Sequence, residues 1–505
     1  MVHIRHSRGR RSNFAGTTVA LLATVLLTVT ACSATQGANS TGQPTPKPGQ
    51  QVPGLGTAQG TGQSIGPEVD AQREPQSTFA IDIDTASYNF ARRQILDGRR
   101  PDRDVIRPEE FINAFRQDFP QPGGNGFAVS ADGARLPRNH ESASTDTRLL
   151  RIGLQTKAED TARRQDAALT FVVDVSGSMS ETGRLDLVQD ALHTLVDQLR
   201  DTDSVAIVSY ESEAHIVREM TSVRSRSALH GAIDRLEIGG STNLEEGLVT
   251  GYRVARDGFV KGATNRVILL SDGLANVGNT SAEPILSQIR EAAAKQISLL
   301  GVGVGSDYGD QLMERLADEG DGFVTYVSER EQARKLFVDQ LPATLAVRAR
   351  DAKVQVTFDP STVATYRLVG YENRALDAEQ FRDNRVDGGE VGPGHSVTAL
   401  YVVTLRRATS GRVAEARVRW LDPTGREAQE QAARITVADL DREFTGASPR
   451  LRVCYAAAYF AESLRGGPYA NEVRLTDLAA VADDASRATD DPQVAELATL
   501  IRKSA

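Results

Sequence analysis

Cysteine is almost absent from this chain of 505 residues, which contains only Cys32 and Cys454. A fold built on a set of disulfides is therefore excluded. Aromatic residues are also scarce, at 5%, and the net charge of −9 is acidic. Because no basic stripe with interleaved aromatic side chains occurs, we expect no nucleic acid as partner. At this length, with 40% apolar residues, two to four domains with sizeable cores are expected.

Recognisable catalytic arrangements are missing as well. His395 follows Gly392-Pro393-Gly394 and is interpreted as a turn residue. There is no nucleotide-binding loop and no Gly-x-Ser-x-Gly elbow, and the twelve residues from Asp174 end in Leu185 instead of the glutamate of an EF-hand loop. None of the histidines beyond the amino-terminal region has metal-ligand spacing; they are His140, His193, His215, His230 and His395. We therefore expect a protein that is not an enzyme, with a surface-attached metal-assisted hydrolase as the alternative.

The amino-terminal region has no apolar run of comfortable membrane-spanning length. Residues 19–29 are apolar and follow an arginine-rich start. They lead into Val29-Thr30-Ala31-Cys32, which resembles a bacterial lipobox, whose cysteine is lipidated and becomes the new amino terminus. We therefore predict a lipoprotein signal peptide over 1–31, acylation of Cys32, and a position on the extracytoplasmic side of the cell membrane. Plain secretion and an uncleaved anchor are the alternatives, and Arg10-Arg11 leaves twin-arginine export open.

Residues 32–76 form a segment of low complexity. They are rich in Gly, Gln, Ser, Thr and Pro and poor in apolar groups. Such a segment cannot bury enough surface to order itself. We predict a disordered tether with an average span of about 35–40 Å, which would hold the remaining chain clear of the membrane. Cys454, by contrast, lies in an apolar helical stretch and is predicted to be a buried small side chain.

The middle of the chain alternates regularly between apolar runs and amphipathic segments. The apolar runs are 169–174, 204–210, 266–271, 297–304 and 323–327. This alternation predicts an α/β fold with a Rossmann-like, doubly wound and mostly parallel sheet, covered by helices on both faces. In such sheets, ligands bind outside the carboxyl ends of the strands.

Oxygen-bearing side chains follow these strands. Asp174 ends an apolar run and is followed by Ser176 and Ser178, while Asp272 ends another run after Ser271. Thr242 stands just before the amino terminus of an expected helix. Mg²⁺ takes oxygen ligands in an octahedron and keeps several waters, so it needs few protein ligands in well-defined places. We therefore predict that these residues meet at one edge of the sheet as a cation site.

This Asp-x-Ser-x-Ser … Thr … Ser-Asp-Gly set resembles the metal-ion-dependent adhesion site of the von Willebrand factor type A (VWA) family. The resemblance implies direct or near contact of the three hydroxyls with the cation, and contact of the aspartates directly or through water. It leaves one position for an Asp or Glu of a protein partner, so a cation-dependent adhesion or scaffolding module is expected. Alternatively, the cation only ties loops together. The implied ligands of Mg²⁺ or Mn²⁺ are Asp174, Ser176, Ser178, Thr242 and Asp272.

The flanking segments resemble the additional domains of a bacterial VWA lipoprotein family, on the motifs at 79–88, 107–113, 366–374 and 394–401. The expected organisation is an amino-terminal domain of helices and then strands (77–165), a VWA domain (166–346), and a carboxy-terminal domain of antiparallel strands and then helices (347–505).

We predict that strands from 126–157 and 350–420 pair in one β-rich domain into which the VWA domain is inserted. Two separate flanking domains are the alternative. Loops 176–182, 239–244 and 273–280 are expected to surround the cation, and a helix over 331–344 to end the VWA domain. Asp82-Ile83-Asp84 is interpreted as a pair of strand-end acids that cap the next helix, with a second cation site as the alternative.

Overall fold

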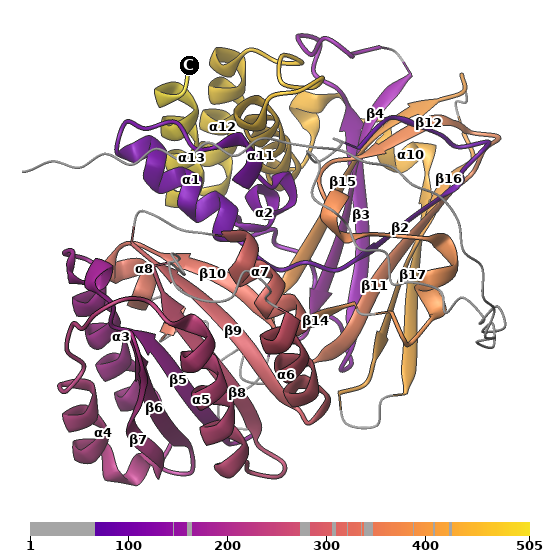
Figure 1. Ribbon diagram of the computed structural model, residues 1–505. Coiled ribbons are helices and arrows are strands. Elements are labelled where there is room, and N and C mark those ends of the chain that lie inside the picture. Colours follow the sequence, from indigo (N-terminus) through magenta and orange to yellow (C-terminus); the bar gives the residue numbers. More distant parts are fainter. Residues whose placement is uncertain are drawn as a thin grey trace, which may run out of the picture. The chain divides into compact units, whose positions relative to one another are not determined.

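A six-stranded sheet organises the middle of the chain (Figure 1). Its strands lie in the order β10-β9-β8-β5-β6-β7, and all neighbours are parallel except β6 and β7. The predicted mostly parallel sheet is therefore confirmed. The strands are β5 (Ala167–Asp174), β6 (Ser204–Tyr210), β7 (Ala214–Ser222), β8 (Thr264–Ser271), β9 (Ile297–Val304) and β10 (Phe323–Val327). The computed structural model describes residues 66–144, 146–158, 164–272, 283–305, 310–320, 322–334, 336–337, 347–386, 388–407, 410–423 and 427–505.

Helices cover both faces of this sheet, as the unbroken apolar strands require. Successive side chains of a strand point to opposite faces. Phe171 and Val173 of β5 accordingly join a core with α3 and α4, while Val172 joins another with α5, α6 and α7. The helices are α3 (Leu185–Gln198), α4 (Arg226–Ile233), α5 (Leu244–Asp257), α6 (Glu283–Ala294), α7 (Asp310–Glu319) and α8 (Arg330–Arg334). Of the helix predicted over 331–344, the structure describes residues 331–334, which belong to α8, and 336–337, and the rest lie outside the described residues.

Two antiparallel sheets form a sandwich around a shared core. One has the order β1-β12-β15-β4-β3 and the other β13-β2-β11-β16-β17, with β14 paired to β11. Ile152 and Tyr401 from the first sheet pack in the same core as Val354 and Val418 from the second. The strands are β1 (Val69–Asp70), β2 (Gln76–Ala80), β3 (Phe127–Arg135), β4 (Thr147–Thr156), β11 (Ala349–Phe358), β12 (Val363–Leu368), β13 (Ala375–Leu376), β14 (Gly389–Val391), β15 (Ser396–Leu405), β16 (Arg412–Leu421) and β17 (Ala428–Thr436).

Segments from before and after the VWA domain pair within both sheets. Strand β4 pairs with β15, where Gln155 lies opposite Ser396. Strand β2 pairs with β11, where Phe79 lies opposite Val354. The predicted pairing between the two flanking segments is thus confirmed, and the VWA domain interrupts the sandwich in sequence.

Helices from both flanks share a further core. Phe111 of α2 and Phe460 of α11 pack edge to face with ring centroids 6.1 Å apart. Pro108, the predicted first residue, does begin α2. The helices of this layer are α1 (Ala86–Leu96), α2 (Pro108–Asn113), α11 (Pro449–Arg465), α12 (Leu475–Thr489) and α13 (Pro492–Lys503), and the short α10 (Val437–Leu440) follows β17. No helix in the described ranges combines the length and hydropathy that a bilayer span requires.

The amino-terminal boundary differs from the prediction. The predicted signal peptide, Cys32 and tether residues up to 65 lie outside the described residues. Residues 66–76, however, carry β1, which pairs with β12, and Ala71 is fully buried. Composition missed this strand because a two-residue edge strand takes its hydrogen bonds from an existing neighbour and needs little apolar surface of its own.

Candidate functional site

Two of the predicted ligands stand at adjacent strand ends. Asp174 is the last residue of β5, and Asp272 directly follows β8. These strands are parallel neighbours, with Val173 opposite Leu270. Both aspartates are fully buried. The two carboxylates therefore lie at the same carboxyl edge of the sheet, as predicted.

The turn after β5 places two hydroxyl groups beside each other. The Ser176 amide donates a hydrogen bond to Oδ1 of Asp174 at 2.9 Å, which tightens the turn. A 3-10 turn then runs from Gly177 to Ser180. It brings Oγ of Ser178 to 3.1 Å from Oγ of Ser176. Two neutral oxygen donors thus lie next to a buried carboxylate.

The loop that carries Thr242 is tied to this turn by two backbone hydrogen bonds. The Gly239 amide donates to the carbonyl of Val175 at 2.7 Å, and the Gly177 amide donates to the carbonyl of Gly240 at 3.0 Å. Oε2 of Glu211 accepts from the Gly240 amide at 2.6 Å. A Cβ at Gly240 would stand 2.6 Å from that same oxygen, so a larger residue there would displace the Glu211 carboxylate from this hydrogen bond. Thr242 itself is buried at this edge.

The two aspartates differ in their hydrogen bonds. Oδ2 of Asp174 accepts from the hydroxyl of Ser271 at 2.8 Å and from that of Tyr210 at 3.2 Å. Burial raises the pKa of Asp174 above its ordinary value, and the hydrogen bonds from Ser176 and Ser271 offset part of that effect. Oδ2 of Asp272 accepts from Arg184 at 2.6 Å, whereas its Oδ1 is buried and accepts no hydrogen bond from the residues that the structure describes.

Sequence reasoning missed Arg184. This residue is the N-cap of α3, where a cation is unfavourable because the helix dipole is positive there. An arginine at an N-cap position was therefore the sequence signal that its side chain has another partner. Its guanidinium donates to Asp272, to the carbonyl of Ser178 at 3.0 Å, and to Glu181 at 2.8 Å. Gly305, at φ +92°, makes room: a Cβ there would stand 2.8 Å from Nε of Arg184.

The donor set fits a hard divalent cation. A buried carboxylate oxygen without a hydrogen bond, as at Asp272 Oδ1, costs free energy unless a proton or a cation reaches it. Carboxylate and hydroxyl oxygens suit Mg²⁺ and Mn²⁺. Within the described ranges, no three His, Cys, Asp or Glu side chains form a metal-binding group. A cation at this edge would therefore need the Ser and Thr hydroxyls as well.

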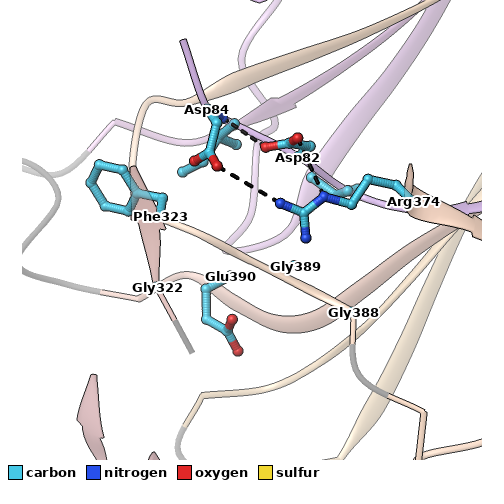
Figure 2. A pocket seen from close by; sticks show the side chains of 10 residues that line it. Asp82, Asp84, Gly322, Phe323, Arg374, Gly388, Gly389 and Glu390 are labelled. Carbon is cyan, nitrogen blue, oxygen red and sulfur yellow. Dashed lines mark hydrogen bonds and ion pairs between the residues drawn. The ribbon is translucent and has the colours of Figure 1, made fainter. Parts of the chain in front are cut away.

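Asp82 and Asp84, the alternative cation site, instead form ion pairs with an arginine. Figure 2 shows both carboxylates directed toward Arg374, whose guanidinium lies 3.3 Å from Asp82 Oδ2 and 3.7 Å from Asp84 Oδ2. Oδ1 of Asp84 accepts from the Val324 amide of β10 at 2.9 Å. The interpretation of these acids as helix caps is wrong as well, because the N-cap of α1 is Thr85, whose side chain accepts no capping hydrogen bond from the helix backbone. These acids join the sandwich to the VWA domain.

Two of the histidines that lack metal-ligand spacing in the sequence are in contact. Nδ1 of His193 lies 2.7 Å from Nδ1 of His230, on α3 and α4. His395 precedes β15, and burial lowers its pKa to about 4.

Cys454 is buried, as predicted, and its thiol donates to Oε1 of Gln117 at 2.9 Å. Burial raises the pKa of Cys454 to about 11, so the side chain is a thiol at neutral pH.

Comparison with known proteins identifies the family of this chain. The chain is 31% identical to the uncharacterized protein YfbK of Escherichia coli (strain K12) over 455 residues, which cover 85% of this chain and 77% of YfbK. The chain belongs to the YfbK family of bacterial VWA proteins. Residues 168–339 of this chain match the von Willebrand factor type A domain, and residues 343–505 match "Uncharacterized protein YfbK, C-terminal". Residues 63–145 match a family described as "von Willebrand factor".

Other similarities cover a smaller share of the chain or are lower in sequence identity. The uncharacterized protein sll0103 of Synechocystis sp. is 30% identical over 195 residues, covering 39% of this chain and 46% of that protein. A solved von Willebrand factor type A protein from Catenulispora acidiphila has a TM-score of 0.45 at 16% identity, covering 74% of this chain and 85% of that one. The match to the VWA family model shows that this YfbK-family chain contains a VWA domain. VWA domains are commonly metal-dependent protein-interaction modules, and they often bind a divalent cation.

Proposed function

We propose that this protein is a membrane-anchored, extracytoplasmic module that binds a protein partner through a divalent cation. Its adhesion site would be formed by Asp174, Ser176, Ser178, Thr242 and Asp272, with Mg²⁺ or Mn²⁺ as the ion. The observation that carries the proposal is the buried Oδ1 of Asp272, which accepts no hydrogen bond in the described part of the chain, at the sheet edge where the Ser176 and Ser178 hydroxyls lie 3.1 Å apart. When bound, the cation would supply a coordination position for an Asp or Glu of the partner.

The charges around the site support an acidic partner. Two buried carboxylates, Asp174 and Asp272, face one buried guanidinium, Arg184. When both acids are ionised, these three groups sum to a single negative charge, and a divalent cation reverses the sign. A carboxylate from a partner would then neutralise the site, because opposite charges are strongly favoured in a poorly solvated position. A neutral or basic ligand gains no such stabilisation.

Membrane attachment rests on the sequence around Cys32. The lipobox-like Val29-Thr30-Ala31-Cys32 motivates it. A single acyl chain gives only marginal binding, so at least two are expected on the mature terminus. The 33–65 segment would then extend the described part of the chain away from the lipid surface, where its cation site can meet a partner.

Calorimetry on the detergent-solubilised full-length protein tests the cation site. Titration with Mg²⁺ and Mn²⁺ is expected to show binding that Asp174→Ala and Asp272→Ala each weaken at least about a hundredfold, because charged ligands are lost. The matched control is Glu181→Gln, since Glu181 is an acid of the same loop whose side chain is 68% exposed and bonds only to Arg184 at the site. Equal affinity in wild type and Asp174→Ala would refute the site.

Partner capture tests the function. Proteins retained from solubilised membranes by the wild type should be lost with chelator, regained with added Mg²⁺, and absent with Asp272→Ala, while Glu181→Gln behaves as the wild type. If Asp272→Ala lost the cation yet kept every captured partner, the site would be structural only. If a panel of ester and phosphate substrates were turned over with the same variant dependence, the metal-assisted hydrolase would replace the binding function.

A further inference from the structure

A second candidate site lies in the sandwich and its helices, outside the VWA domain. A cavity of about 310 Å³ opens there. This volume is far above that of a single water and reaches the lower end of small-molecule sites. Its walls come from β4, β12, β15 and α11, with loop residues before β1, after β3 and after α11. The lining residues are Glu68, His140, Ser142, Thr147, Arg367, Val402, Thr404, Tyr459, Tyr469 and Glu472.

Arg367 brings an almost fully buried guanidinium to this cavity. Its Nη1 donates to Oε1 of Glu462 at 2.9 Å, and its Cζ lies 3.6 Å from the ring centroid of Tyr469. The hydroxyl of Tyr459 is also close to it. In the described ranges, Nε and Nη2 have no carboxylate partner. A guanidinium presents five donors in a planar fork that matches a carboxylate. The remaining donors favour an oxygen-rich anionic group in the cavity.

The charge of Arg367 is balanced within a group of two arginines and two glutamates. The carboxylate of Glu462 is fully buried and also accepts from Nη2 of Arg465 at 3.1 Å. Arg465 in turn lies 3.1 Å from Oε1 of Glu372. The two arginines and two glutamates therefore balance each other. The charge balance of the cavity is decided by the other residues that line it.

Two further carboxylates give the cavity a negative region. Oε2 of Glu472 accepts from the Ser142 amide at 3.0 Å and lies 3.2 Å from Nδ1 of His140. Oε1 of Glu68 accepts from the hydroxyl of Thr365. Each carboxylate thus uses one oxygen in these bonds. His140 does not neutralise them at pH 7, because burial lowers its pKa to about 4. An ammonium group would be stabilised here.

We propose that this cavity binds a small zwitterion, an α-amino acid or a dipeptide. Arg367 would hold the carboxylate of the ligand, Glu68 and Glu472 would hold its ammonium group, and Val402 with the tyrosine rings would contact its side chain. A phosphate or dicarboxylate is disfavoured because both glutamates repel it. A polyamine is disfavoured because it offers no acceptor to Nε and Nη2 of Arg367, which have no carboxylate partner in the described ranges. The proposal is independent of the cation site.

Calorimetry on the full-length protein, with the twenty common L-amino acids and L-alanyl-L-alanine as probes, tests this site. At least one probe is expected to bind. Its decarboxylated and its deaminated analogues should each bind at least tenfold more weakly, because each loses one charged contact. Chelator should leave the affinity unchanged. Failure of every probe to bind would overturn the proposal, as would equal affinity for the amine alone.

A matched pair of variants locates the binding. Glu68→Gln should weaken the best probe at least tenfold, since Glu68 lines the cavity and is exposed enough for the change to leave the fold intact. Asp70→Asn is the control, because Asp70 is an acid on the same segment with its side chain 48% exposed and outside the lining. Unchanged melting temperatures would show that both variants fold. Equal binding by Glu68→Gln and the wild type would overturn the assignment.

Discussion

The guanidinium of Arg184 donates a hydrogen bond to Oδ2 of Asp272 at 2.6 Å, within the candidate cation site. Both side chains are almost wholly buried, with 4% and 0% of their surface exposed. Removing one partner of a buried ion pair leaves the other charge uncompensated. The same guanidinium also repels any cation that Asp272 binds. Arg184 therefore stabilises the cation-free protein and opposes cation binding.

Arg184→Gln separates these two effects. Without cation, the free energy of unfolding should fall by about 3 kcal/mol, because Asp272 loses its charged partner. The affinity for Mg²⁺ should rise at least about tenfold, because one repulsive charge is gone. Chemical denaturation with and without Mg²⁺, together with calorimetry, measures both quantities. Arg330→Gln is the control, since the Arg330 side chain is 71% exposed and pairs with acids on α3. A weaker Mg²⁺ affinity in Arg184→Gln would mean that Arg184 positions ligands.

The strand ends of the candidate site were predictable from sequence, whereas Arg184 was not. A short apolar run rich in β-branched residues, such as that of β5, favours a strand buried on both faces, and this predicts Asp174 at its carboxyl end. Helix α5 begins at Leu244, as predicted, because the Asn243 side chain accepts from the Glu246 amide at 3.2 Å and caps it. Hydrophobic periodicity and helix capping depend on residues close together in sequence, so they can be predicted from the sequence alone.

Pairing between distant side chains is not local. Arg184 and Asp272 are 88 residues apart, and the contact between Arg374 and Asp82 spans 292 residues. Nothing in the periodicity around Asp82 distinguishes a helix-capping acid from an ion-paired one. The pairing of β4 with β15 was predictable only in outline, since alternation shows that one face is buried but gives no register.

Cys32→Ala tests the predicted anchor. Wild-type protein should fractionate with membranes and carry label from radioactive fatty acid, whereas the variant should lose the label and most of its membrane association. Cys454→Ala is the matched control, because Cys454 is the other cysteine of the chain and is buried in α11. Label on Cys32→Ala equal to that on wild type would refute acylation at this residue.

Two helix glycines give a test of packing in the VWA domain. A Cβ at Gly251 of α5 would stand 2.3 Å from Cγ2 of Val172, while one at Gly231 of α4 would meet no atom closer than 3.9 Å. Alanine is favoured over glycine in a helix by about 0.5–1 kcal/mol. Gly231→Ala should gain this amount. Gly251→Ala should lose about 1–3 kcal/mol through overpacking against β5.

Chemical denaturation of the two variants measures this difference. Opposite signs are expected, although the substitution is the same and both sites are helical. If both variants were stabilised, α5 would not lie against Val172 as described. The cation site would be affected as well, because α5 follows directly from the loop that carries Thr242.

Glu109 of α2 provides a pH-dependent test of the flanking domains. Its carboxyl group is fully buried, and neither oxygen accepts a hydrogen bond of good geometry from the described residues. Burial, together with the charges of Glu372 and Asp82, raises the pKa of Glu109 from 4.5 to about 8. The folded protein therefore holds a proton that the unfolded chain releases above pH 4.5. Its contribution to stability is present below that pH and is lost as the pH rises toward 8, at about 1.4 kcal/mol per pH unit.

Glu109→Gln mimics the protonated side chain and should remove this pH dependence. The variant should match the wild type near pH 5 and exceed it in free energy of unfolding at pH 8, as measured by urea denaturation at pH 5, 6.5 and 8. Glu110→Gln is the neighbouring control. Oε2 of Glu110 accepts from the Ser87 amide at 2.8 Å, so losing that charge should destabilise the protein. If Glu109→Gln gave the same difference from wild type at pH 5 and pH 8, the Glu109 carboxyl group would not change its protonation state across this range. The fold around α2 would then have to supply Glu109 with a partner.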